Sequence, residues 1–145
     1  MLLPAATAAG WNPLAPRPIE VTILTGIIVS SDLVGTPGFS FGALPATQQV
    51  TLINRGAIYG ARFPSKVDKT SNQAWEGGPA LRINSPTTLI NSGVIVGGAG
   101  SGDPNEGDSC GNCGGGNGGS SGGAGGPAID ALAQLTITNT GTIWG

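Results

Sequence analysis

The residues best suited to chemistry lie in a glycine-rich stretch, where Cys110 and Cys113 form a C-x-x-C pair. The chain has two cysteines and no His, so a zinc site would need carboxylates or a neighbouring subunit to complete four ligands. A redox pair would be expected at the start of a helix in an α/β pattern, and the surrounding residues predict neither. The pair predicts a local disulfide or two free thiols, and a cross-subunit bond or a metal stays open as the alternative.

A short acidic turn from Asp103 to Asp108 precedes this pair. Its oxygen-rich side chains suggest a calcium loop, but the Asp-x-Asn spacing is not continued and the closing Glu is missing. Pro and Gly within the turn explain its shape without an ion, so no metal is predicted and calcium is the alternative. The candidate contacts with a binding partner in this turn and in the run after it are Asp103, Asn105, Glu106, Asp108, Asn112 and Asn117.

A second candidate for recognition is the insert at 61–76, which combines Arg62 and two lysines with Trp75. Trp and Arg are enriched at the positions that contribute most binding energy to protein interfaces, so contact with a partner is one alternative. The favoured interpretation is that Trp75 caps the end of a β stack while the charged side chains are solvated.

No catalytic set can be assembled from the remaining residues. Ser and Thr are plentiful but lack a His to act as their base, and the acidic residues do not group beyond the 103–108 turn. A carboxylate pair could serve a glycosidase, but the chain is too short for a solenoid that carries a cleft. The sequence therefore predicts a binding or structural protein that is not an enzyme and uses no cofactor.

Charge and hydropathy disfavour two further classes of protein. Six basic and eight acidic residues do not supply the basic surface that a nucleic-acid binder needs. The longest apolar stretch, 19–29, is far shorter than the roughly 20 residues that a helix needs to cross a membrane. Residues 1–19 are rich in Pro and predict an extended arm that docks onto another protein, rather than a secretory signal.

A repeat dominates the rest of the chain, which is rich in the strand-forming residues Ile, Leu, Val and Thr. The sequences VTLINRGAIYG at 50–60, TTLINSGVIVG at 87–97 and LTITNTGTIWG at 135–145 align with shifts of 37 and 48 residues, and VTILTGIIVSS at 21–31 is a degenerate fourth copy. Such units bury their apolar face only by stacking on one another. We therefore predict an all-β module over 20–145, solenoid-like or interleaved, with a polar insert at 61–76 and a long glycine-rich insert at 97–126.

Each copy contains Asn-x-Gly between two short β runs. Both residue types tolerate left-handed backbone angles, so the chain is expected to bend there, in a hairpin turn or at a solenoid corner. The corner is favoured because the second run is short and because the Asn side chains would stack as a hydrogen-bonded ladder. The predicted turn residues are Asn54, Gly56, Asn91, Gly93, Asn139 and Gly141.

Two further features leave alternatives open. Tyr59, Val96 and Trp144 share one repeat position and predict either core or a subunit interface. In residues 97–126 half of the chain is Gly, which predicts either a flexible loop or a bundle of extended polyglycine helices held by backbone hydrogen bonds.

Four segments in this order carry a resemblance to a known family: ALPATQQVTLINRGAIYG, GGPALRINSPTTLINSGVIVGG, the Gly-rich run and GGPAIDALAQLTITNTGTIWG. Together they resemble the distal end of tail tip attachment proteins, or central tail fibres, of long-tailed bacteriophages. The resemblance implies a virion protein whose trimeric β tip binds a protein or glycan receptor on the host through glycine-rich loops. A homotrimer also follows from the small apolar area that a monomer with such short strands would bury. The alternatives are a capsid fibre or decoration protein without a receptor role, and a binder of ice or carbohydrate surfaces.

Overall fold

The chain forms a stack of β-strands. The structure is a computed structural model, and it describes residues 8, 10, 17–42, 44–45, 47–62, 76–100 and 124–145. Its elements in these residues are all strands, so the prediction of an all-β fold is confirmed. They are β1 (Ile19–Ile23), β2 (Ile28–Ser30), β3 (Phe39–Ser40), β4 (Val50–Asn54), β5 (Ala57–Tyr59), β6 (Leu81–Ile83), β7 (Thr87–Asn91), β8 (Val94–Val96), β9 (Ile129–Ala131), β10 (Leu135–Asn139) and β11 (Thr142–Trp144).

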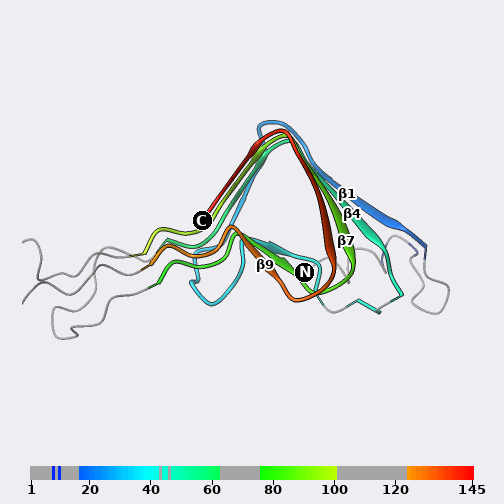
Figure 1. Ribbon diagram of the computed structural model, residues 1–145, viewed down its shortest axis with the longest axis horizontal. Coiled ribbons are helices and arrows are strands. Elements are labelled where there is room, and N and C mark those ends of the chain that lie inside the picture. Colours follow the sequence, from blue (N-terminus) through cyan, green and yellow to red (C-terminus); the bar gives the residue numbers. More distant parts are fainter. Residues whose placement is uncertain are drawn as a thin grey trace, which may run out of the picture.

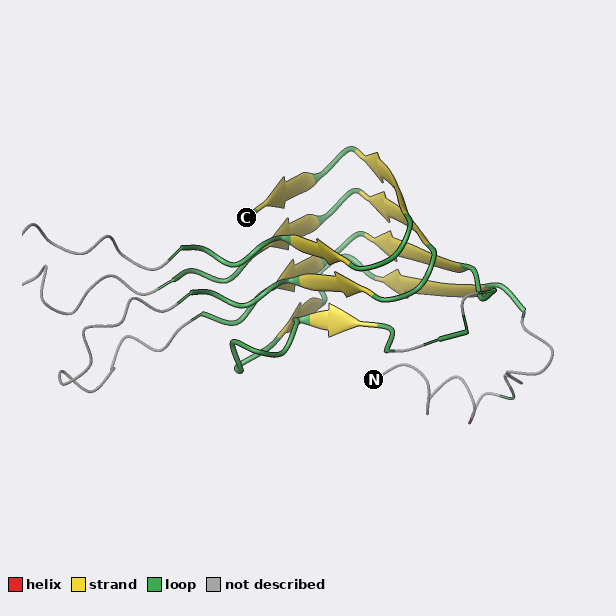
Figure 2. Ribbon diagram, turned by 60° about the horizontal axis from the view of Figure 1, so that its bottom comes forward, coloured by secondary structure: helices red, strands yellow, loops and turns green. Residues whose placement is uncertain are grey.

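Three parallel sheets form the sides of a triangle (Figure 1). Sheet A has the order β1-β4-β7-β10, sheet B has β11-β8-β5-β2, and sheet C has β3-β6-β9. The chain passes through the three sheets in turn, so each circuit is one rung laid parallel on the previous one (Figure 2). Each sheet therefore receives one strand from each rung that reaches it.

The strand register follows the sequence repeat. Val50 pairs with Thr87, and Leu135 pairs with the same Thr87, which reproduces the shifts of 37 and 48 residues between the copies. Residues at the same repeat position therefore lie above one another, and Leu52, Leu89 and Ile137 form one such row. Because successive side chains of a strand point to opposite faces, a whole row lies either inside the triangle or outside it.

A single chain encloses a hydrophobic core inside the triangle. The side chains of Leu52, Ile58 and Leu89 are fully buried there. Phe41 is fully buried as well, and its ring meets that of Phe39 edge to face with 5.2 Å between centroids. The enclosed core removes the physical reason given above for a trimer, because one chain buries its own apolar rows.

At the corner between sheets A and B, the Asn side chains form the predicted ladder. Asn54 Nδ2 donates to Asn91 Oδ1 at 2.7 Å, and Asn91 Nδ2 donates to Asn139 Oδ1 at 2.7 Å. Ile23 occupies this position in the first rung, so the ladder begins at Asn54, whose Oδ1 is buried without a hydrogen-bond partner. The ladder thus has a fixed direction, with each amide donating to the next rung.

The glycines of this corner serve close stacking and not a left-handed backbone. None of Gly56, Gly93 and Gly141 has a positive φ, so the left-handed prediction is wrong for them. A Cβ on Gly93 would lie 2.1 Å from the carbonyl oxygen of Gly56, and one on Gly141 would lie 2.1 Å from that of Gly93. The left-handed residue of this corner is Gly26 (φ +82°), in the degenerate first rung, where four residues replace two.

The docking arm predicted at the N-terminal side stays a prediction. Most of the proposed arm at 1–19 lies outside the described residues, and its last residue, Ile19, begins β1. Across the described ranges, the structure contains no helix with the length and apolar character required to span a membrane.

Candidate functional site

Both long inserts leave the stack at the corner between sheets B and C (Figure 1). The first insert follows β5 and returns to β6, and the second follows β8 and returns to β9. The described ends of these inserts, called legs below, comprise residues 60–62, 76–80, 97–100 and 124–128. They run side by side in both views (Figure 2).

Backbone hydrogen bonds join the legs of the two inserts to one another. Gly78 N donates to Ala61 O at 2.9 Å, Gly98 N donates to Gly78 O at 2.8 Å, and Gly126 N donates to Gly98 O at 2.7 Å. Departing and returning legs therefore alternate along this chain of bonds, and the bond between Gly98 and Gly78 joins the second insert to the first. One further backbone hydrogen bond joins the two inserts, in which Gly77 N donates to Ala124 O at 3.0 Å.

Glycine is a steric requirement in this set of legs, which we call the glycine lattice. A Cβ on Gly97 would lie 1.7 Å from Gly126 O, and a Cβ on Gly98 would lie 1.8 Å from Ala61 O. Gly77 is equally restricted, with Gly98 O at 1.8 Å from its Cβ position. Backbones from distant parts of the chain thus approach more closely than any side chain permits, which fixes the directions in which the inserts depart.

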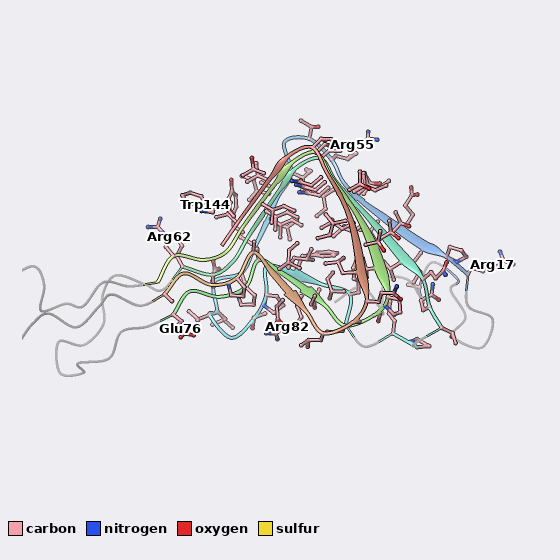
Figure 3. The ribbon with its side chains drawn as sticks, in the orientation of Figure 1. Arg17, Arg55, Arg62, Glu76, Arg82 and Trp144 are labelled. Carbon is pink, nitrogen blue, oxygen red and sulfur yellow. The ribbon has the colours of Figure 1, made fainter. Side chains whose placement is uncertain are left out.

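Larger side chains surround the lattice on the outer face of sheet B (Figure 3). Tyr59, Val96 and Trp144 are paired across β5, β8 and β11 in one outward row. Tyr59 is 37% exposed and Trp144 is 73% exposed, so the core alternative for this repeat position is wrong. The subunit-interface alternative stays a prediction.

Arg62 lies at the first leg and is exposed. It lines an open groove of about 460 Å³ together with Ser30, Ser31, Asp32, Tyr59 and Gly60. Glu76 lies at the returning leg, on the opposite side of the legs from Arg62 (Figure 3). The base of the inserts therefore offers one guanidinium group, carboxylates and an aromatic ring for polar and apolar contact.

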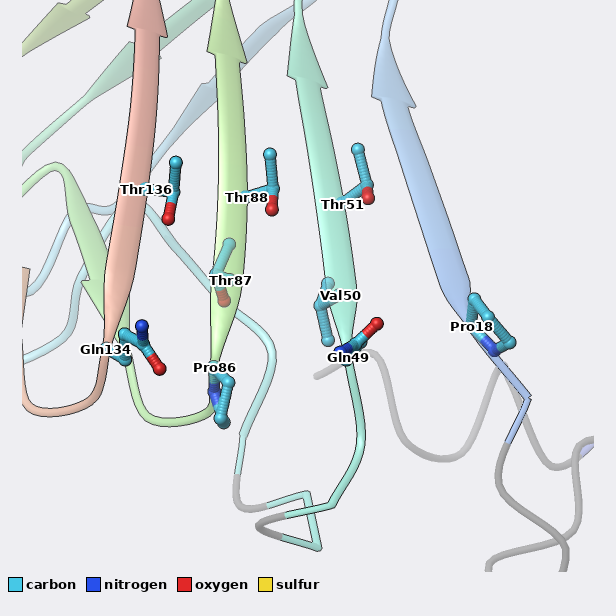
Figure 4. Close-up of a pocket in the computed structure, with 9 residues that line it drawn as sticks. All are labelled: Pro18, Gln49, Val50, Thr51, Pro86, Thr87, Thr88, Gln134 and Thr136. Carbon is cyan, nitrogen blue, oxygen red and sulfur yellow. The ribbon is translucent and has the colours of Figure 1, made fainter.

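A second groove, of about 220 Å³, crosses the outer face of sheet A (Figure 4). Its lining is neutral, with one row of alternating proline and glutamine residues and a parallel row of threonines. Such a surface can donate and accept hydrogen bonds but contains no acid, base or nucleophile for catalysis. Its rows are Pro18, Gln49, Pro86 and Gln134, and Thr51, Thr88 and Thr136.

Most of the predicted contact residues lie outside the described residues. The structure places Arg62 and the six turn residues, and it separates them, because the turn residues lie at the corner between sheets A and B. Among the described residues, no three His, Cys, Asp or Glu side chains gather as a metal site would require. The predicted residues that fall outside are Trp75, Asp103, Asn105, Glu106, Asp108, Cys110, Asn112, Cys113 and Asn117.

Sequence reasoning missed the glycine lattice and the proline-glutamine row. The signal for the lattice was present, because Gly-Gly-Pro-Ala recurs at 77–80 and 125–128 directly before β6 and β9. The signal for the second row was Gln49, Pro86 and Gln134, each of which directly precedes a repeat copy. The backbone contacts of the lattice and the proline-glutamine row involve no charged side chain, which is why a search for chemical groups passed over them.

Comparison with known proteins gives one match. The family model described as phage tail fibre adhesin Gp38 matches residues 3–124, which include the first two Asn-x-Gly copies and almost all of both inserts. No curated protein and no solved structure matches the chain. The family match confirms the resemblance inferred from the repeat and the glycine-rich run, and it favours the tail over the capsid. The chain therefore belongs to the phage tail fibre adhesin Gp38 family and is a protein of the virion tail.

Proposed function

We propose that this chain is a receptor-binding adhesin that attaches the phage to the host surface through its two inserts, the glycine-rich one at 97–126 and the polar one at 61–76. The three-sheet stack acts as a β-solenoid scaffold, and adhesion rather than catalysis is its task. The observation that carries the proposal is that both inserts leave from one corner and are joined there by the glycine lattice.

The lattice supports this role because it holds the base of the inserts in place. Recognition segments are commonly loops held by a rigid scaffold. A scaffold that fixes where such segments begin lowers the conformational entropy lost on binding, which raises affinity without adding contacts. Backbone hydrogen bonds of 2.7 to 2.9 Å join neighbouring legs, so this scaffold has a defined geometry where the two inserts leave the stack.

The proposed contacts come from two kinds of residue. The polar residues of 103–117 would hydrogen-bond a protein or glycan receptor, and Trp75 with Arg62 would supply the larger contact area. The groove beside Arg62 supports the second part, because Tyr59 and Asp32 lie with it at the base of the first insert. Residues 1–19 would dock the chain onto another tail protein.

Competition with phage adsorption tests the proposal. Purified protein is expected to reduce adsorption of the phage to its host, whereas a variant with residues 101–123 replaced by a short Gly-Ser linker is not. The linker variant keeps the described legs, and its fold is checked by circular dichroism and thermal unfolding. Equal competition by both proteins would show that the second insert is not the contact, and no competition by either would favour a structural role without receptor binding.

The homotrimer is a separate proposal that rests on the resemblance alone. Light scattering at micromolar concentration measures the mass of the assembly, and a monomer there would refute the trimer. Receptor binding by the inserts does not depend on this result, because the core of the stack is enclosed by one chain.

A further inference from the structure

The first rung turns the corner between sheets B and C by a short loop, whereas the next two rungs carry the long inserts there. This loop, residues 31–38, joins β2 to β3 and packs against the legs. A Cβ on Gly38 would lie 2.2 Å from Tyr59 O, and Gly38 N donates to Pro79 O at 3.1 Å. Because the loop is shorter than the first insert, a step forms between the two rungs, and the groove beside Arg62 lies at this step.

Hydrogen bonds fix the shape of the loop where it borders the groove. Ser31 Oγ donates to Leu33 O at 3.1 Å and accepts from Leu33 N at 3.2 Å. Thr36 N donates to Leu33 O at 2.9 Å, which closes the following turn. Asp32 lies between the two residues that Ser31 Oγ joins, and it lines the groove. Its backbone is thus held in place before any ligand binds, which lowers the conformational entropy lost on binding.

The groove combines an aromatic ring with charged and neutral polar groups. Tyr59 points outward from sheet B, and its neighbours in that row are Ser30 on one side and Val96 on the other. Arg62 lies beside the outer face of the same sheet (Figure 3), and Asp32 adds a carboxylate to the lining. Ligand sites are typically clefts of roughly 300–1,000 Å³ with apolar surface and a few placed polar groups. The groove, of about 460 Å³, has this size and composition.

These groups fit one ring of a neutral saccharide better than an anion or an apolar segment. A sugar ring has a C–H face that packs on an aromatic side chain, and its rim carries hydroxyl groups in adjacent pairs. Such a pair can donate to the two oxygens of a carboxylate or accept from a guanidinium group. A phosphate group would face Asp32 as well as Arg62, and like charges at close range are unfavourable. An apolar segment would desolvate both charged groups without giving them hydrogen-bond partners.

We propose that the groove between the 31–38 loop and the leg at 60–62 binds one ring of a neutral glycan of the host surface. The inference rests on the receptor-binding function proposed above and specifies the chemical class of ligand at the base of the first insert. Tyr59 packs on the face of the sugar ring, and Asp32 and Arg62 hydrogen-bond its hydroxyl groups.

Two-dimensional NMR of the isotope-labelled full protein tests this site. The probes are the methyl glycosides of glucose, galactose, mannose and N-acetylglucosamine and the neutral oligosaccharides released from the host surface, with inorganic phosphate as the anion. At least one saccharide is expected to shift the backbone amides of Ser31, Tyr59 and Gly60, with a dissociation constant of about 1 mM for a single ring. Phosphate is expected to leave these amides unchanged.

Exposed side chains provide the variants, so the enclosed core is left intact. Tyr59→Ala is expected to weaken saccharide binding by about tenfold, whereas Tyr59→Phe, which keeps the ring, changes it by less than about threefold. Asp32→Asn removes the charge at nearly constant shape and is expected to weaken binding by about fivefold. Trp144→Ala is the matched control, because it removes an exposed aromatic ring from the same outward row but outside the groove.

Binding that is lost with Tyr59→Ala and kept with Trp144→Ala supports the proposal. The glycan site is overturned if no saccharide shifts these amides, if phosphate shifts them instead, or if both Ala variants weaken binding equally. If no saccharide binds but the protein still competes with phage adsorption, the adhesin function stands and the glycan site is refuted. Saccharide binding without such competition supports the site and contradicts the adhesin function.

Discussion

Replacing Asn91 by Asp changes one buried amide of the ladder into a carboxyl group of nearly the same size and shape. Asn91 is 1% exposed; its Oδ1 accepts from Asn54, and its Nδ2 donates to Asn139 Oδ1. The variant keeps the first bond and loses the second. It also places a carboxylate oxygen about where the amide nitrogen was, facing Asn139 Oδ1.

The expected loss of stability follows from this geometry. An uncompensated buried charge costs about 3–5 kcal/mol, which is a large part of the 5–15 kcal/mol that stabilises an ordinary domain. Burial and the facing oxygen raise the pKa of the new carboxyl group in the folded state above its unfolded value of about 3.9. The loss is therefore complete above the folded pKa and shrinks as the pH falls through it, since a protonated carboxyl group can donate to Asn139.

Asn139→Asp is the matched control at the exposed end of the ladder. Asn139 Oδ1 accepts from Asn91 Nδ2 and from Gly141 N, and a carboxylate can accept from both. The variant loses only the exposed bond that Asn139 Nδ2 donates to Gly141 O at 3.2 Å. We expect a loss below about 1 kcal/mol with little pH dependence. Urea denaturation between pH 4 and 8 measures both variants. Equal losses, or a loss for Asn91→Asp that does not change with pH, would refute the ladder as a buried and directional network.

Three further substitutions test other parts of the structure. Gly98→Ala is expected to lower the free energy of unfolding, measured in urea, by about 1–3 kcal/mol. Gly35→Ala is the control, because it adds a Cβ in open space and is expected to be neutral or slightly stabilising. Equal effects of the two substitutions would contradict the glycine lattice. Ile23→Asn would place an amide beside the unpartnered Asn54 Oδ1 and extend the ladder by one bond. The Ile23→Asn protein should therefore be about 1 kcal/mol more stable than the Ile23→Ala protein. A lower stability of the Asn variant would contradict the directional ladder. Arg82→Met breaks an ion pair whose side chains are about one-third exposed. It should lower the free energy of unfolding by less than about 1 kcal/mol, and a larger loss would show that the pair is not solvent-screened.

The repeat predicted much of the fold because the same stacking arrangement recurs between successive copies of the motif. Residues at equivalent positions, such as Asn54 and Asn91, must lie one above the other once copies stack, so the alignment gave the register directly. The role of the glycines could not be found in this way. Gly93 is needed because Gly56 O lies against it, and that contact joins residues 37 positions apart. A single copy shows only that glycine is present, and its conformational freedom is the nearest local explanation.

The candidate site, like the fold, could be predicted from the sequence only in part. The chemical types of the insert residues were readable from the sequence. The sequence did not show that Arg62 would share a groove with Asp32, because their proximity depends on the pairing of β2 with β5. The outward position of Tyr59 and Trp144 was also undecided, since alternation along a strand gives two faces and does not say which one the sheets enclose.

By itself the sequence determined that this protein is an all-β module of repeated units, and it favoured a stack with an Asn ladder, because identical short motifs can bury their apolar rows only on one another. The tertiary structure decided the rest. Closure of three sheets into a triangle selected the inner rows, brought both inserts to one corner, and packed their backbones so closely that only Gly fits. These features depend on distances between segments tens of residues apart, and no local propensity encodes them.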